Sequence, residues 1–208
     1  EVESGGERFT VDAGEVILSS GAIGSPHIML LSGVGPADNL GEIGIPVIHE
    51  LPGVGQNLRD HPMVFTTWQT KPDYPLDGFA PRVQTILRWT AEGSDVRNDL
   101  LIFMQSYATD RGVGDVPPLG IRMLASLELQ LSAGELRLTS SDPDEQPSLD
   151  YRYLQYDEDL RRMREAVRLC VSLGQHEKFT DIIESRIEPT DDELSSDEKL
   201  DAYMLREA

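Results

Sequence analysis

Side chains that could take part in acid–base chemistry gather in one short segment, where Asn57, Asp60 and His61 follow the glycines at positions 53 and 55. A carboxylate next to a histidine can orient the imidazole ring and raise its basicity, as a general base requires. The same residues could instead form a hydrogen-bonded loop that lines a ligand pocket. The sequence by itself leaves both roles open for His61.

A second segment, residues 15–36, has the composition of a strand, a glycine turn and a helix. Residues 16–18 form a short apolar run, which is typical of a parallel strand covered on both faces. Residues 20–24 have little side-chain bulk, so a ligand could approach main-chain atoms closely. Ser25 suits the N-cap and Pro26 the first position of a helix that runs to Leu31. Free N–H groups at such a helix start attract electron-rich atoms of a ligand.

Other common reactive arrangements are missing from the sequence. Ser25 and Ser32 do not stand in a Gly-x-Ser-x-Gly nucleophile elbow. The remaining histidines are isolated, and no spacing of His, Cys, Asp or Glu predicts a metal site. The single cysteine, Cys170, excludes an intrachain disulfide and is predicted to pack in the core.

Composition narrows the class of protein. The 208 residues carry a formal net charge of −19, so nucleic acid and anionic membrane surfaces are poor partners. With 39% apolar residues and no apolar run near 18 residues, the sequence predicts a soluble globular protein without a membrane-spanning segment. The acidic N-terminus shows no signal-peptide pattern, so we expect a cytoplasmic location.

Hydrophobic patterning beyond the glycine turn predicts both helices and antiparallel strands. Apolar residues at helical spacing predict helices over residues 38–43, 82–91, 157–173 and 196–206. Residues 64–70 and 100–104 read as strands because they are rich in β-branched, aromatic and aliphatic side chains. Residues 122–131 are predicted to form a strand with one solvent-facing side and to make a hairpin with residues 134–138. The chain therefore combines an α/β region with an α+β region.

Several segments together resemble the glucose-methanol-choline (GMC) family of flavin-dependent alcohol oxidoreductases. The second signature of that family reads roughly Gly-Ala-x-x-Ser-Pro-x-x-Leu-x-x-Ser-Gly-x-Gly. Its positions are found here at Gly21, Ala22, Ser25, Pro26, Leu30 or Leu31, Ser32, Gly33 and Gly35. The likeness continues through residues 36–40, 44–46 and 51–62, and it returns at residues 134–143 and 147–154. It is loose between residues 64 and 129.

The resemblance implies a fold, a cofactor and a reaction. Residues 1–62 would be part of an FAD-binding Rossmann-like domain. Residues 63–208 would be a substrate domain built on an antiparallel sheet with flanking helices, with the family's C-terminal region starting at about residue 133. A small-molecule alcohol would be oxidised by hydride transfer to FAD, and oxygen or another acceptor would take the electrons. The residues expected to contact FAD are Ser20, Gly21, Ala22, Ile23, Ser25, Asn57, Asp60 and His61.

Two features of the family do not occur in this sequence. There is no Gly-x-Gly-x-x-Gly turn for the ADP half of FAD, and no histidine follows His176, although the family places its catalytic histidine in a C-terminal segment. We therefore expect the chain to be the middle of a longer enzyme and assign no catalytic residue within it. The alternatives are a non-catalytic α/β binding module, or an FAD-containing lyase of the same family.

Overall fold

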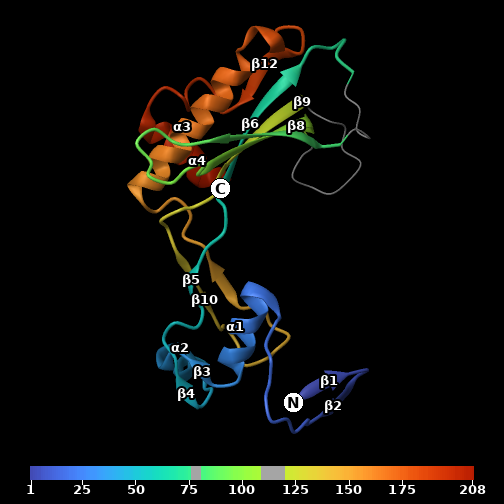
Figure 1. Cartoon of the computed structure of the whole chain (residues 1–208), viewed down its shortest axis with the longest axis vertical. Helices are drawn as coiled ribbons and strands as arrows, with labels where there is room; N and C mark the ends of the chain where they lie inside the picture. The colour runs from blue at the N-terminus through green and yellow to red at the C-terminus, as the bar shows by residue number, and fades with distance from the viewer. Residues whose placement is uncertain (76–80, 109–119) are drawn as a thin grey trace. The chain divides into compact units, whose positions relative to one another are not determined.

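The computed structural model describes residues 1–75, 81–108 and 120–208 (Figure 1). Backbone contacts divide the chain into two compact units. The first unit comprises residues 1–56 and 135–149, and the second comprises residues 57–134 and 150–208. The domain boundary expected between residues 62 and 63 stays a prediction. The assignment of the two parts of the chain to cofactor and substrate stays a prediction.

The first unit is built from short elements. The hairpin of β1 (Val2–Ser4) and β2 (Glu7–Phe9) precedes helix α1 (Gly21–Leu31), and α2 (Ala37–Ile43) lies between the parallel pair β3 (Val34–Gly35) and β4 (His49–Glu50). Strands β5 (Gln56–Leu58), β10 (Gly134–Arg137) and β11 (Ser148–Asp150) form a three-stranded sheet in the order β11-β10-β5. The small core consists of Leu30, Leu40, Val54, Leu136 and Leu138.

Asn39 ties the early and late segments of this unit together. Its side-chain nitrogen donates to the carbonyl of Leu138 at 3.2 Å, and its side-chain oxygen accepts the Leu138 N–H at 3.0 Å. Asn39 is 2% exposed, so both bonds are shielded from water. The predicted helix over residues 38–43 is confirmed as α2, which ends at Gly44 in the left-handed conformation.

The second unit is a five-stranded antiparallel sheet with helices on one face (Figure 1). The strands lie in the order β12-β6-β9-β8-β7. Their bounds are β6 Met63–Thr70, β7 Val83–Trp89, β8 Leu100–Ala108, β9 Gly120–Leu127 and β12 Ile183–Glu188. Helices α3 (Asp157–Gly174) and α4 (Asp197–Glu207) are joined through the 3-10 turn η1 (Glu177–Phe179) and β12. The antiparallel sheet with flanking helices, predicted from the sequence, is confirmed.

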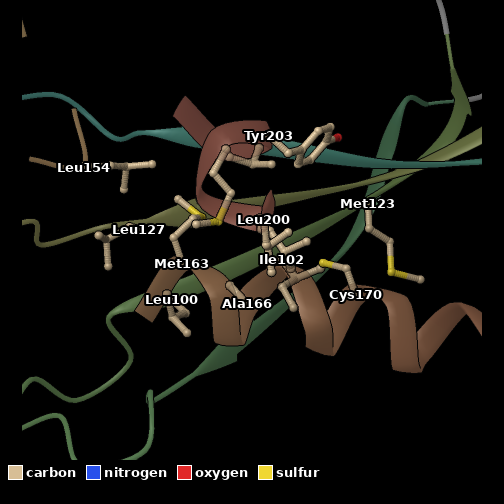
Figure 2. Close-up of a cluster of buried hydrophobic side chains, with 14 of the residues drawn as sticks. Leu100, Ile102, Met123, Leu127, Leu154, Met163, Ala166, Cys170, Leu200 and Tyr203 are labelled. Carbon is tan, nitrogen blue, oxygen red and sulfur yellow. The ribbon is translucent and has the colours of Figure 1, made fainter. Parts of the chain in front are cut away.

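Apolar side chains of α3, α4 and the sheet form one core (Figure 2). Met163, Ala166 and Cys170 of α3 are fully buried against the strands, as the helical spacing of this segment predicts. Burial raises the pKa of the Cys170 thiol to about 12, so the side chain stays protonated and packs as a small apolar group. Gly174 is fixed by the same packing, because a Cβ there would lie 2.4 Å from the Trp68 ring.

Three predicted elements of the second unit are wrong. Within the helix predicted over residues 82–91, residues 83–89 form the edge strand β7 instead, and every residue of β7 is exposed. Strand β9 ends at Leu127, and it is buried along its whole length instead of having a solvent-facing side. The segment 134–138 does not return beside β9, because β10 pairs with β5 and β11.

A buried network of charges joins α3 to two loops of the second unit. Arg162, 2% exposed, donates to Asp159 at 2.6 Å and to Asp99 at 3.1 Å. Asp159 also accepts hydrogen bonds from the N–H groups of Leu131 and Ser132. Burial acts to raise the pKa of both carboxyl groups, but hydrogen bonds and the guanidinium together lower it below the ordinary value. For Asp99 these hydrogen bonds come from the Ser94 hydroxyl and the Ala91 N–H.

The lowered pKa values make the second unit sensitive to acid. A carboxylate whose folded pKa is depressed contributes stability that is present above its unfolded pKa, about 4, and is lost as the pH falls through the folded pKa. We expect the free energy of unfolding, followed by fluorescence of Trp68 and Trp89, to fall below about pH 4. The Ser94 hydroxyl donates to Asp99 at 2.7 Å, so Ser94→Ala should move this loss to higher pH. Ser172→Ala, which changes an exposed serine of α3, is the control, and an equal shift in both variants would contradict the assignment.

Candidate functional site

The glycine turn and the signature helix differ locally from the prediction. Residues 16–18 are not a strand: Val16 is 76% exposed, Ile17 is 82% exposed, and their backbone is irregular. The residues predicted as a turn are the first turn of α1, which begins at Gly21 with Ser20 as its N-cap. An apolar run of three residues becomes a strand only when another strand accepts its hydrogen bonds, and within the described residues none does so.

Ser25 is not the N-cap, and Pro26 is not the first helical residue; both lie inside α1. The Ser25 hydroxyl accepts the N–H of Ser20 at 3.0 Å, which closes the first turn from within the helix. Gly24 has to lack a side chain because a Cβ there would lie 2.7 Å from the Cβ of Ser20. The signature residue Ser25 and its neighbour Gly24 therefore shape the turn.

Gly21 opens the helix in a conformation that favours glycine. Its φ is +81°, and a Cβ added there would meet no atom within 4 Å. The N–H groups in the first turn of a helix have no intrahelical acceptors, so those of Gly21, Ala22 and Ile23 can bind an electron-rich ligand atom. Gly21 and Ala22 are exposed, and Ile23 is half-buried. This end of α1 fits the close approach of a planar cofactor to the main chain.

The exposed residues before α1 should promote self-association of the isolated 208-residue chain. Covering a large apolar side chain contributes about 1.5–3 kcal/mol, so the double change Val16→Ser and Ile17→Lys should weaken association at least about tenfold. Sedimentation velocity over a range of concentrations measures this. Leu205→Lys, which changes a 53% exposed residue of α4, controls for the added charge. An equal effect of the control would show that the apolar run is not responsible.

In the segment of Asn57, Asp60 and His61, the carboxylate next to the histidine in sequence is not the one that faces its imidazole. Asp60 does not orient the imidazole, because its Oδ1 accepts the main-chain N–H of His61 at 2.8 Å. The imidazole Nδ1 instead lies 3.4 Å from Oε2 of Glu128. Asn57, at φ +60°, accepts a hydrogen bond from the Nε of Arg59 at 2.9 Å. His61 is thus brought to Glu128, Asp60 is bonded to the main chain of His61, and Asn57 is bonded to Arg59.

A small pocket of about 160 Å³ lies beside His61, within the second unit. The guanidinium of Arg59 already donates two hydrogen bonds within the chain, from Nη1 to the Gln130 carbonyl at 2.8 Å and from Nε to Asn57. The two carboxylates, Asp60 and Glu128, make the pocket unfavourable for an anion. The pocket suits a neutral group that carries O–H or N–H donors. It is lined by Arg59, Asp60, His61, Glu128, Leu129 and Gln130.

Tyr153 of the second unit lies near enough to Asp60 to feel its charge. Burial raises the pKa of its hydroxyl to about 12, and the nearby charge of Asp60 adds to the increase. Its ring stacks on Tyr151 with the centroids 5.1 Å apart. Tyr153 therefore stays protonated at neutral pH and can act only as a neutral hydrogen-bonding group.

Glu128 could not be found from the sequence. It is 67 positions from His61, and a lone glutamate after a leucine-rich strand has the pattern of an ordinary solvent-facing residue. Only the pairing of β6 with β9, in register Met63↔Ser126, brings the two segments together. The segments 20–25 and 57–61 lie in different units. The described residues contain no cluster of three potential metal ligands.

Comparison with known proteins gives the family. The N-terminal and C-terminal models of the GMC oxidoreductase family match residues 1–63 and 130–208, respectively. The chain belongs to the GMC oxidoreductase family, and the resemblance and the predicted fold class are confirmed. None of the helices in the described part of the chain is long and apolar enough to cross a membrane.

Named relatives cover most of the chain. It is 31% identical to an oxygen-dependent choline dehydrogenase of Chromohalobacter salexigens, over 93% of this chain and 39% of that protein. It is 33% identical to the glucose dehydrogenase [FAD, quinone] of Drosophila melanogaster, over 77% of this chain and 30% of that protein. The structure of a formate oxidase from Aspergillus oryzae matches with a TM-score of 0.78 at 23% identity, over 93% of this chain and 42% of that one. The chain thus spans well under half the length of these relatives.

Proposed function

We propose that this chain forms part of an FAD-dependent oxidoreductase that oxidises a small-molecule alcohol by hydride transfer to FAD. The observation that carries the proposal is the start of α1, where Gly21 at φ +81° opens a helix with exposed N–H groups on the segment that matches the family model. Two similar proteins are named as dehydrogenases of choline and glucose, which are both alcohols. Bound FAD would supply the hydride acceptor.

The residues of the chain would hold the cofactor. Gly21, Ala22 and Ile23 would offer main-chain N–H groups, and Ser20 and Ser25 would keep that turn closed through their mutual hydrogen bond. In the second unit, Asp60 and His61 would contribute through the pocket that they line, and Asn57 would contribute through its hydrogen bond to Arg59, which also lines that pocket. No described residue is assigned the role of catalytic base. A cytoplasmic location remains part of this proposal.

The test is to express the full reading frame that encodes these residues and to measure flavin content and dye reduction with a panel of alcohols. Stoichiometric flavin and turnover with one of the alcohols are expected. Flavin without redox turnover would favour the lyase of the same family, and absence of flavin would favour a non-catalytic module. Residues 1–208 expressed alone are expected to bind FAD much more weakly, because the sequence has no Gly-x-Gly-x-x-Gly turn for the pyrophosphate.

A further inference from the structure

The segment of residues 128–132, which follows β9, has no regular secondary structure, yet the backbone of each residue is anchored. The Glu128 N–H donates to the carbonyl of Asp99 at 2.9 Å. The Leu129 carbonyl accepts from Arg162 at 3.1 Å. A non-repetitive segment loses conformational freedom when each residue is fixed, so these hydrogen bonds have to offset that cost.

The second half of the segment is fixed in the same way. The Gln130 carbonyl accepts from Nη1 of Arg59, and the N–H groups of Leu131 and Ser132 donate to Asp159 at 2.9 and 2.8 Å. Asp159 is fully buried and bonded to Arg162, so the anchor belongs to the rigid part of α3. The backbone position of Glu128 is therefore set by the sheet, by α3 and by Arg59.

One carboxylate oxygen of Glu128 is fixed by a hydrogen bond, and the other faces the imidazole of His61. Oε1 accepts the Ser126 hydroxyl at 2.7 Å, and Oε2 lies 3.4 Å from Nδ1 of His61. The Glu128 side chain is 22% exposed, against 49% for His61, so the carboxylate is the better-shielded partner. The other imidazole nitrogen, Nε2, has no hydrogen-bond partner among the residues that the structure describes.

We propose that Glu128 is a positioning residue that holds neutral His61 in the tautomer with the proton on Nδ1. In this tautomer Nε2 is an acceptor, beside the pocket of Arg59, Asp60 and Gln130. It accepts an O–H or N–H donor from a neutral group of the bound ligand. The inference rests on the proposed function, in that the ligand is the flavin cofactor or the alcohol.

The tautomer is measured directly, without flavin, by nitrogen NMR of the histidine-labelled chain at a pH where the imidazoles are neutral. The chain has only four histidines, so His→Gln variants assign the signals. We expect His61 to carry its proton on Nδ1. In Glu128→Ala it should change to the Nε2–H form that free histidine favours, while the other three histidines are unchanged.

Two further variants separate positioning from charge. Glu128→Gln keeps an oxygen acceptor without the charge, so it should retain the Nδ1–H tautomer. Glu92→Ala removes an exposed carboxylate elsewhere in the second unit and should leave His61 unaffected. A wild-type His61 with its proton on Nε2, or a tautomer that Glu128→Ala does not change, would overturn the proposal.

The ligand is identified in the protein made from the full reading frame. If the flavin supplies the donor, Glu128→Ala should raise the Kd for FAD about tenfold, which corresponds to the loss of roughly one hydrogen bond. Glu128→Gln should have a Kd close to that of the wild type. If the alcohol supplies the donor, KM should rise by a similar factor at unchanged flavin content. A Glu128→Ala variant with wild-type Kd and KM would refute the ligand contact. A wild-type protein that binds no flavin would instead refute the proposed function. The NMR measurement of the His61 tautomer needs no flavin, so it would still test the role of Glu128.

Discussion

Replacing Arg162 by methionine is expected to lower the free energy of unfolding of the second unit by about 3–5 kcal/mol. Methionine fills a similar volume, but it leaves the fully buried carboxylates of Asp99 and Asp159 without their cation. It also leaves the Leu129 carbonyl without its donor. Urea unfolding followed by tryptophan fluorescence measures the loss, because Trp68 and Trp89 both lie in this unit.

The neighbouring Arg161 supplies the control on the same helix. Its side chain is 37% exposed, and its ion pairs with Glu158 and Glu165 are at the surface. Exposed ion pairs contribute at most about 1 kcal/mol, so Arg161→Met should be nearly neutral. Similar losses in the two variants would mean that the buried network does not stabilise the unit beyond an ordinary surface pair.

Gly21→Val, made in the full reading frame, is expected to reduce flavin occupancy to a small fraction of the wild-type value. A β-branched residue at φ +81° is strained, and its side chain would occupy the space through which a planar ligand reaches the N–H groups of the first turn. The variant should therefore lose both cofactor and some stability. Flavin content per protein after purification measures the first effect, and thermal unfolding of the flavin-free protein measures the second.

Gly6 provides a matched control for the strain. It also has φ +81°, and a Cβ there would also meet no atom within 4 Å, but it lies in the turn between β1 and β2. Gly6→Val should cost about the same stability, of the order of 1–2 kcal/mol for a left-handed non-glycine residue, and should keep its flavin. If Gly6→Val lost flavin as Gly21→Val does, the loss would reflect strain instead of blocked access.

The sequence predicted the elements whose neighbours in the chain decide their structure. The helical spacing of apolar residues predicted α3 over residues 157–173 and α4 over residues 196–206, and α4 begins where the Ser196 hydroxyl accepts the Lys199 N–H. The prediction of a helix failed for Val83, Ile86 and Leu87. Their helical spacing does not mark a buried helix face, because they lie in an edge strand whose residues are all exposed. There the pairing with β8 outweighs the local pattern.

In the candidate site, too, the sequence predicted only what neighbouring residues decide. The segments with Gly21 and His61 were found from residue types alone, because glycine, serine and histidine have distinctive backbone or acid–base properties. The start of α1 was misplaced because Ser25 and Pro26 have the pattern of a helix start, whereas in the structure Ser25 bonds back to Ser20 from inside the helix. Glu128 was missed because the pairing of two distant strands determines its neighbour.

The return of residues 135–149 to the first unit has a consequence for synthesis on the ribosome. Asn39 bonds to Leu138, which is synthesised 99 residues later. At a translation rate of about 5–20 residues per second, the synthesis of these residues takes roughly 5–20 seconds. Until then Leu30, Leu40 and Val54 have neither Leu136 nor Leu138 to pack against. The nascent chain therefore presents a half-formed apolar core during translation, and a ribosome-associated chaperone that binds exposed leucines would shield it until the second half of that core has emerged.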